Sequence, residues 1–233
     1  AQVPYLGCTA ITFVLFPLLG KANAQGDEES GRAMAERALR YALLIIMPVA
    51  TTLTAAGPGV LAAIFPPAYA GAAGALRILA FSYVACALCS VLCTMLNARG
   101  RPMTSAISVG IGALITAGAA WVMVPAWGMT GGAVASLLGM VTSTALAGYA
   151  LTVQRAVRWP LSSLVRHLVA AGVVTTVGMM VPWPSGTLMA RLAGLGGAAV
   201  SGVAVLVLLV VLGEIGRAEL DLLKGVLKGK SRT

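Results

Sequence analysis

The stretch MTSAISVGIGALITAGAAWVMVP at residues 103–125, followed closely by MTGGAVASLLGMVTSTALAGYALTV at residues 129–153, decides the fold. Neither stretch contains a charged side chain, and each exceeds the roughly 20 apolar residues that a helix needs to cross a bilayer. The connection Pro125–Gly132 is rich in Gly and contains Pro and Trp, which is typical of a tight turn. The two stretches therefore predict a helical hairpin that crosses a membrane twice.

The composition extends this prediction to the whole chain. The 233 residues are 59% hydrophobic and only 10% charged, whereas a soluble domain is about 25% charged. Backbone groups in lipid must bond internally, so the apolar runs should be helices. We expect an all-α integral membrane protein, a polytopic helical bundle with about seven transmembrane helices. The expected spans are Val3–Gly20, Ala38–Phe65, Ala72–Leu96, Met103–Pro125, Met129–Val153, Ser163–Trp183 and Leu192–Gly213.

The basic residues indicate how these spans are oriented. All 16 Lys and Arg residues except Arg77 and Arg191 fall in alternate loops on one side of the predicted membrane. Cytoplasmic loops collect Lys and Arg, so this side should be cytoplasmic, with the C-terminus inside and the N-terminus outside. The tail 214–233 is amphipathic and predicts either a helix on the membrane surface or a solvated cytoplasmic helix.

The net charge of +9 is explained by membrane topology, and no element typical of nucleic-acid binding accompanies it. Cys86, Cys89 and Cys93 lie on one helical stripe. A metal site would need further ligands that the sequence does not place near them, so we interpret them as small apolar residues in a helix seam. No cofactor is predicted.

Proline and glycine interrupt the second predicted span at Pro48 and at Gly57-Pro58-Gly59. These residues kink or break a membrane helix where neighbouring groups satisfy the freed backbone. A packing kink is the simpler interpretation. The alternative is a broken helix at a binding site, as transporters use.

Between Glu36 and Glu214 the sequence contains no Asp or Glu. Membrane-embedded acid–base catalysis and cation sites usually need buried carboxylates, so we expect a protein that is not an enzyme. Arg77 lies inside the start of the third span, where it could bind an anion through its forked guanidinium or extend to the outer headgroups. Arg166 and Arg191 are predicted boundary anchors, and His167 a hydrogen-bonded interface residue.

Several segments, taken in order, resemble the C-terminal half of polysaccharide and O-antigen flippases of the multidrug/oligosaccharidyl-lipid/polysaccharide exporter superfamily. The segments are Phe16-Pro17-Leu18-Leu19, Arg37–Leu44, Phe65–Tyr69, Leu76–Ala80, Leu96–Pro102 and Val124–Ala133. The resemblance implies one lobe of a two-lobed transporter of about twelve to fourteen helices. It also implies an oligosaccharide substrate linked to a lipid pyrophosphate, which is moved across the bacterial inner membrane.

This resemblance makes Arg77 the expected contact for the anionic substrate, with the membrane lipids and a missing N-terminal lobe as partners. The first run begins at Ala1 without a start Met or a basic flank, so we expect a fragment and not a signal peptide. Two alternatives stay open. One is a drug/cation antiporter of the same superfamily, whose essential carboxylate would lie in the missing half, and the other is a non-transporting scaffold for glycan assembly.

Overall fold

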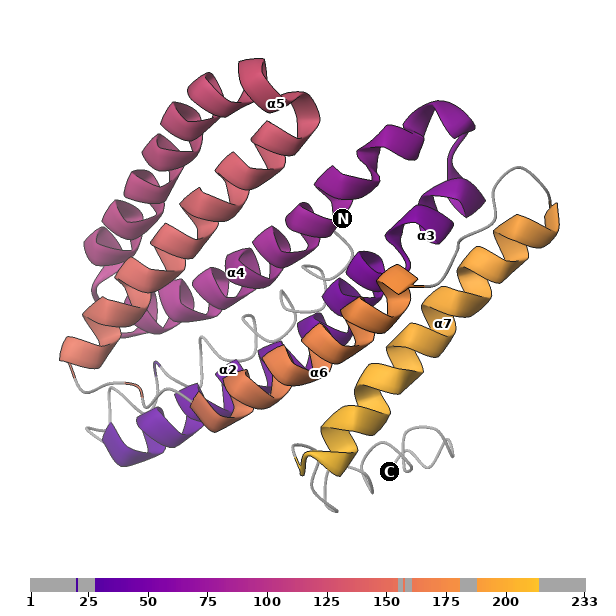
Figure 1. Cartoon of the computed structure of the whole chain (residues 1–233). Helices are drawn as coiled ribbons and strands as arrows, with labels where there is room; N and C mark the ends of the chain where they lie inside the picture. The colour runs from indigo at the N-terminus through magenta and orange to yellow at the C-terminus, as the bar shows by residue number, and fades with distance from the viewer. Residues whose placement is uncertain (1–19, 21–27, 155–156, 158–160, 181–187, 214–233) are drawn as a thin grey trace, which may run out of the picture.

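The computed structural model describes residues 20, 28–154, 157, 161–180 and 188–213, and every regular element in these ranges is a helix (Figure 1). Five helices are long and apolar enough to cross a membrane. The all-helical, polytopic membrane fold predicted from the sequence is therefore confirmed in these ranges. In chain order the elements are α2 (Glu28–Ala55), α3 (Gly57–Ile64), the 3₁₀ helix η1 (Pro67–Ala72), α4 (Ala73–Ala98), α5 (Pro102–Val153), α6 (Leu161–Met180) and α7 (Leu188–Val211).

The helices differ from the predicted spans in two informative places. The second span, Ala38–Phe65, is divided into α2 and α3, and α2 begins earlier, at Glu28. The fourth and fifth spans form one hairpin, α5, in which Gly128 (φ 56°, ψ −132°) has non-helical torsion angles at the turn. The first predicted span, except Gly20, and the tail 214–233 lie outside the described residues.

Helix α2 is the centre of the bundle. It packs against α4 on one side and against α6 and α7 on the other, while the α5 hairpin packs on α4 (Figure 1). The short helix α3 leaves the end of α2 and lies against α7. The chain therefore builds a layered arrangement in which α2 and α4 separate the hairpin from the α6–α7 pair.

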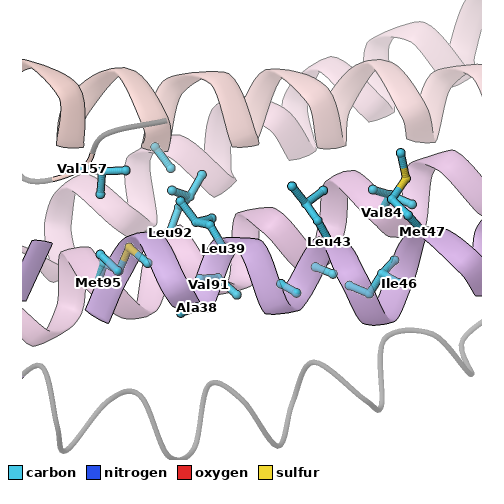
Figure 2. Packing of buried hydrophobic residues seen from close by; sticks show 14 of the residues in the cluster. Ala38, Leu39, Leu43, Ile46, Met47, Val84, Val91, Leu92, Met95 and Val157 are labelled. Carbon is cyan, nitrogen blue, oxygen red and sulfur yellow. The ribbon is translucent and has the colours of Figure 1, made fainter. Parts of the chain in front are cut away.

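The largest buried cluster joins α2 to α4. Leu39, Leu43 and Ile46 recur at helical spacing along α2, and Figure 2 shows them among Val91 and Leu92 of α4. Burying a large aliphatic side chain contributes about 1.5–3 kcal/mol relative to water, but lipid is itself apolar, so close van der Waals packing carries more of the association here. The same cluster includes Val157, which follows α5.

The two arms of α5 cross at a pair of glycines. A Cβ on Gly112 would collide with the Ser143 side chain, and a Cβ on Gly139 would collide with the Thr116 side chain. Both hydroxyls donate within their own arms, Thr116 to the Gly112 carbonyl and Ser143 to the Gly139 carbonyl, each at 3.0 Å. The arms therefore approach backbone to backbone, as small residues permit in membrane helices.

The outward faces of this hairpin are apolar and open. Trp121 is 85% exposed, and Leu114, Met103 and Met129 are similarly uncovered. A helix with apolar side chains around its whole circumference is expected in lipid. These faces are consistent with direct contact between the hairpin and membrane lipid.

We expect Gly139→Ala to lower the stability of the chain in detergent by about 1–3 kcal/mol, because a methyl group at the crossing has no space. Thermal unfolding followed by circular dichroism measures the change. The matched control is Gly110→Ala in the same hairpin, since a Cβ there meets nothing within 4 Å. It should be neutral, or stabilising by up to about 1 kcal/mol through helix propensity. Equal effects of the two substitutions would contradict the close crossing.

Candidate functional site

The break between α2 and α3 is a defect in the helical hydrogen-bond ladder. Helix α2 ends at Ala55, and α3 restarts at Gly57 with Pro58 in its first turn. In a continuous helix the amide of residue 58 would donate to the carbonyl of Thr54, but proline has no N–H. The Thr54 carbonyl therefore needs another donor, since an unsatisfied backbone group is costly in a membrane.

Arg77 of α4 supplies that donor. Its Nε donates to the Thr54 carbonyl oxygen at 3.1 Å, and the side chain is half-buried. Its Cγ lies 3.9 Å from where a Cβ of Gly57 would be. The guanidinium thus lies at the break, held through Nε, and within the described residues its two terminal nitrogens have no acceptor and remain as donors.

Glycines of α6 and α7 close around the same break. A Cβ on Gly178 of α6 would meet Ala55 at 2.6–3.0 Å, and a Cβ on Gly194 of α7 would collide with the carbonyl of Gly59. Ala55, Gly57 and Gly59 are themselves buried. Helices from four parts of the chain therefore converge on one short non-helical link.

Three threonines in the last turns of α2 bond to the backbone of their own helix, close to Pro48. The hydroxyls of Thr51, Thr52 and Thr54 donate to the carbonyls four residues earlier, at 2.7, 2.8 and 2.8 Å. Such back-bonding satisfies the hydroxyl inside lipid and often bends a helix. The interrupted second span is therefore broken after Ala55, while Pro48 lies inside the continuous helix α2.

Arg166 and His167, two further basic residues singled out in the sequence, make their bonds away from the break. Arg166 donates from Nη1 to the carbonyl of Gly213, at 3.4 Å, just past the end of α7. His167 is 1% exposed, and its Nδ1 lies 2.8 Å from the carbonyl of Ser163. Arg191 belongs to α7, and its side chain is outside the described residues.

Sequence reasoning identified Arg77 but not its acceptor. The signal was present, because a proline at position 58 deprives the carbonyl of Thr54 of its helical donor. What the sequence could not show is that α4, beginning at Ala73, returns past this point. The contacts of Gly178 and Gly194 were likewise missed, although both residues belong to glycine-containing runs.

The chemistry available at the break is electrostatic. No carboxylate occurs between Glu36 and Glu214, so the positive charge of Arg77 has no acidic side chain from α3 to α7 to neutralise it. Terminal guanidinium nitrogens bind phosphate or carboxylate oxygens in a planar, forked geometry. The site is suited to hold an anion and has no group suited to transfer protons.

Three comparisons place the chain among known proteins. The family model "Lipid II flippase MurJ" matches residues 6–194. A solved structure titled "Lipid II flippase MurJ, inward closed conformation" superposes with a TM-score of 0.69 at 13% sequence identity, over 88% of this chain and 43% of that one. At this identity the superposition supports the shared fold alone.

The curated relative "Uncharacterized membrane protein MJ1068" from Methanocaldococcus jannaschii is 28% identical over 126 residues. That alignment covers 54% of this chain and 25% of the relative. The chain therefore spans a quarter of this relative and less than half of the solved structure.

A double-mutant cycle tests the bond between Arg77 and Thr54. Arg77→Met should destabilise the chain by about 1–3 kcal/mol, because a buried carbonyl loses a charged donor. In a Pro58→Ala background the alanine N–H can replace that donor, so the same substitution should cost clearly less. Thermal unfolding in detergent of the four variants gives the coupling energy. Identical costs in both backgrounds would show that Arg77 does not serve the carbonyl left by Pro58.

Proposed function

Because the chain belongs to the lipid II flippase MurJ family, we propose that it forms one lobe of a flippase that moves a lipid-linked glycan across the membrane by alternating access. Members of this family are transporters and not enzymes. The observation that carries the proposal is the family match over residues 6–194. The absence of acidic residues between Glu36 and Glu214 is compatible with an anionic pyrophosphate, which buried carboxylates would repel.

The chain spans 43% of the solved flippase, so the proposal assigns it most of one lobe, paired with an N-terminal lobe. Two-lobed transporters place the substrate where the lobes meet. The proposed partners are therefore the second lobe, the membrane lipids and the lipid-linked substrate.

Two lipid-linked glycans are candidate substrates. The family is named for lipid II, the lipid-linked precursor of peptidoglycan, and this makes lipid II the first candidate substrate. The order of sequence segments described above favours a second candidate of the same chemical class, the lipid-pyrophosphate-linked precursor of a polysaccharide or O-antigen. Both candidates share the pyrophosphate, so Arg77 would serve either one.

We assign Arg77 the substrate contact within this lobe. The bond from Nε to Thr54 holds the guanidinium at the break. A guanidinium fixed at one nitrogen loses less conformational freedom when its terminal nitrogens meet a phosphate. In this role the broken helix supplies the position, and the terminal nitrogens supply the contact.

The full-length protein, reconstituted in liposomes, tests the activity. A fluorescent lipid II and a fluorescent O-antigen-type precursor are compared for movement to the opposite leaflet. Movement of one precursor but not of fluorescent phospholipid is the expected result and identifies the glycan. Transport of cationic drugs, driven by a sodium or proton gradient, would favour an antiporter, and no movement of any substrate would favour a scaffold.

Arg77→Ala should reduce the rate of flipping at least tenfold, because the anion loses a charged contact of about 1.5–3 kcal/mol. The Pro58→Ala/Arg77→Ala double variant separates substrate contact from support of the backbone. Pro58→Ala returns an N–H donor to the Thr54 carbonyl. Recovery of flipping in the double variant would therefore show that Arg77 serves only as a donor to this carbonyl and does not contact the substrate. Continued loss, with Pro58→Ala alone active, is the result expected for a substrate contact.

We also propose that the chain lies in the bacterial inner membrane with its C-terminus in the cytoplasm, on the distribution of Lys and Arg. In a variant with all four native cysteines replaced by serine, Ser231→Cys should resist a membrane-impermeant maleimide applied to spheroplasts. Ala68→Cys, in η1 between α3 and α4, is the matched control and should react. Labelling of position 231 in intact spheroplasts would reverse the proposed orientation.

A further inference from the structure

A cavity of about 210 Å³ lies in the seam between α4 and both arms of the α5 hairpin. Cys86, Cys89 and Cys93 line it from α4, and Gly112 and Ser143 line it from the two arms. Helices α4 and α5 pack side by side (Figure 1). The cavity therefore belongs to a different interface from the break between α2 and α3.

The lining offers few polar partners to a water molecule. The hydroxyls of Thr116 and Ser143 already donate to carbonyls of their own arms, each at 3.0 Å. The sulfurs of Cys89 and Cys93 lie 3.8 Å apart and share a hydrogen bond. Ser90 supplies the remaining hydroxyl of the lining, whereas an ordered water needs about two to four polar partners. The cavity is therefore suited to an apolar guest.

The cysteines of the lining are part of this apolar surface. In the described residues no group of three or more His, Cys, Asp or Glu side chains is arranged to hold a metal ion. The three thiols are free, and a free cysteine packs as a small apolar side chain. No carboxylate lines the cavity, so the site has nothing to attract a cation.

Part of the lining is buried and part is open to the membrane. Gly112, Ser143 and Cys89 are buried. Val109, which is 47% exposed, and Ala113 are exposed residues of the first arm. The outward face of this arm is apolar, as expected for contact with lipid. A guest can therefore enter the cavity sideways, from the lipid around the hairpin.

The depth of the cavity in the bilayer limits what this guest can be. Gly112 lies ten residues after Pro102, and Ser143 lies ten residues before Val153. At 1.5 Å per residue, both lie about 15 Å from the ends of their arms. Because the hydrocarbon layer is about 30 Å thick, the cavity lies inside this layer, among lipid chains and away from the headgroups.

We infer that this cavity is a binding site for the hydrocarbon chain of a membrane phospholipid, whose end inserts between α4 and the hairpin. Its volume of about 210 Å³ exceeds the roughly 150 Å³ of an apolar cavity that stays dry and binds benzene. It therefore accommodates several carbon atoms of one chain and not a whole lipid. The inserted chain gives the lining atoms the van der Waals contacts that an empty cavity would deny them.

A polyprenyl chain, such as the tail of a lipid-linked glycan, has the same apolar chemistry. Phospholipid chains surround the hairpin at a far higher concentration than the tail of a transported substrate, so mass action favours the phospholipid. This inference rests on the membrane fold and does not depend on which substrate the protein transports.

Photo-crosslinking of the full-length protein in liposomes tests the site. The liposomes contain a phospholipid with a diazirine near the end of one acyl chain, and adducts are located by peptide mass spectrometry after irradiation. Adducts are expected within residues 86–93 of α4, whose cysteines line the cavity. Adducts confined to outward hairpin residues such as Leu114 and Trp121 would show contact with bulk lipid only and would overturn the proposal.

A variant that fills the cavity separates a bound chain from passing lipid. Ala113→Leu adds three carbon atoms to the lining and should lower the adduct yield within residues 86–93 at least fivefold. The matched control is Ala106→Leu, the same substitution at an exposed position of the same arm outside the lining, and it should leave the yield unchanged. If Ala113→Leu fails to fold, Ser90→Leu fills the cavity from α4 instead.

Two results would overturn the assignment. One is an unchanged yield within residues 86–93 in a folded, cavity-filling variant. The other is labelling of these residues by a diazirine-bearing polyprenyl phosphate in place of the phospholipid, which would assign the cavity to a polyprenyl tail.

Discussion

The requirement that every backbone carbonyl in lipid find a donor explains how this lobe is organised. Pro58 removes the donor for Thr54 at the end of α2, and a guanidinium from α4 replaces it at 3.1 Å. Around that repair, Gly178 of α6 and Gly194 of α7 come close enough that neither could carry a side chain without displacement. The helical hydrogen-bond pattern is interrupted at this point. Five helices meet there: α2, α3, α4, α6 and α7.

This constraint also bears on the proposed transport. A guanidinium recruited to repair a backbone defect brings a positive charge into an environment that the sequence keeps free of carboxylates from Glu36 to Glu214. The same side chain can then satisfy two different needs with different nitrogens, the carbonyl through Nε and an anion through its terminal nitrogens. A lysine has one compact ammonium group, so it could not bind the carbonyl and an anion through separate nitrogens of a planar group.

The sequence predicted the features that depend on local pattern. Length and polarity indicated the hairpin of residues 103–153. Its Gly- and Pro-containing turn contains Gly128, the residue with non-helical torsion angles. Gly57-Pro58-Gly59 indicated where the second span would be disturbed, and Arg77 was singled out by its charge and depth. Each of these inferences needs only neighbouring residues.

What the sequence could not provide are the partners from distant helices. Thr54 and Arg77 are 23 residues apart, and a glycine stripe such as that around Gly194 fits many neighbours equally well, so packing alone selects Gly59. The cysteine stripe of α4 was visible, but the sequence does not show that Met140 and Ser143, from the second arm of α5, line the same cavity. Tertiary packing decides these pairs.

The length of the α5 hairpin has a consequence for the surrounding bilayer. Its 52 residues divide at Gly128 into arms of about half that length, and at 1.5 Å per residue each arm is about 39 Å long. The hydrocarbon layer is about 30 Å thick, so the arms must incline, emerge into the headgroups or thicken the lipid beside them. The tryptophans near the turn suit the headgroup region. Hydrophobic mismatch would thus favour thicker membranes or an inclined hairpin, with the tilt itself set by packing against α4 and by these anchors.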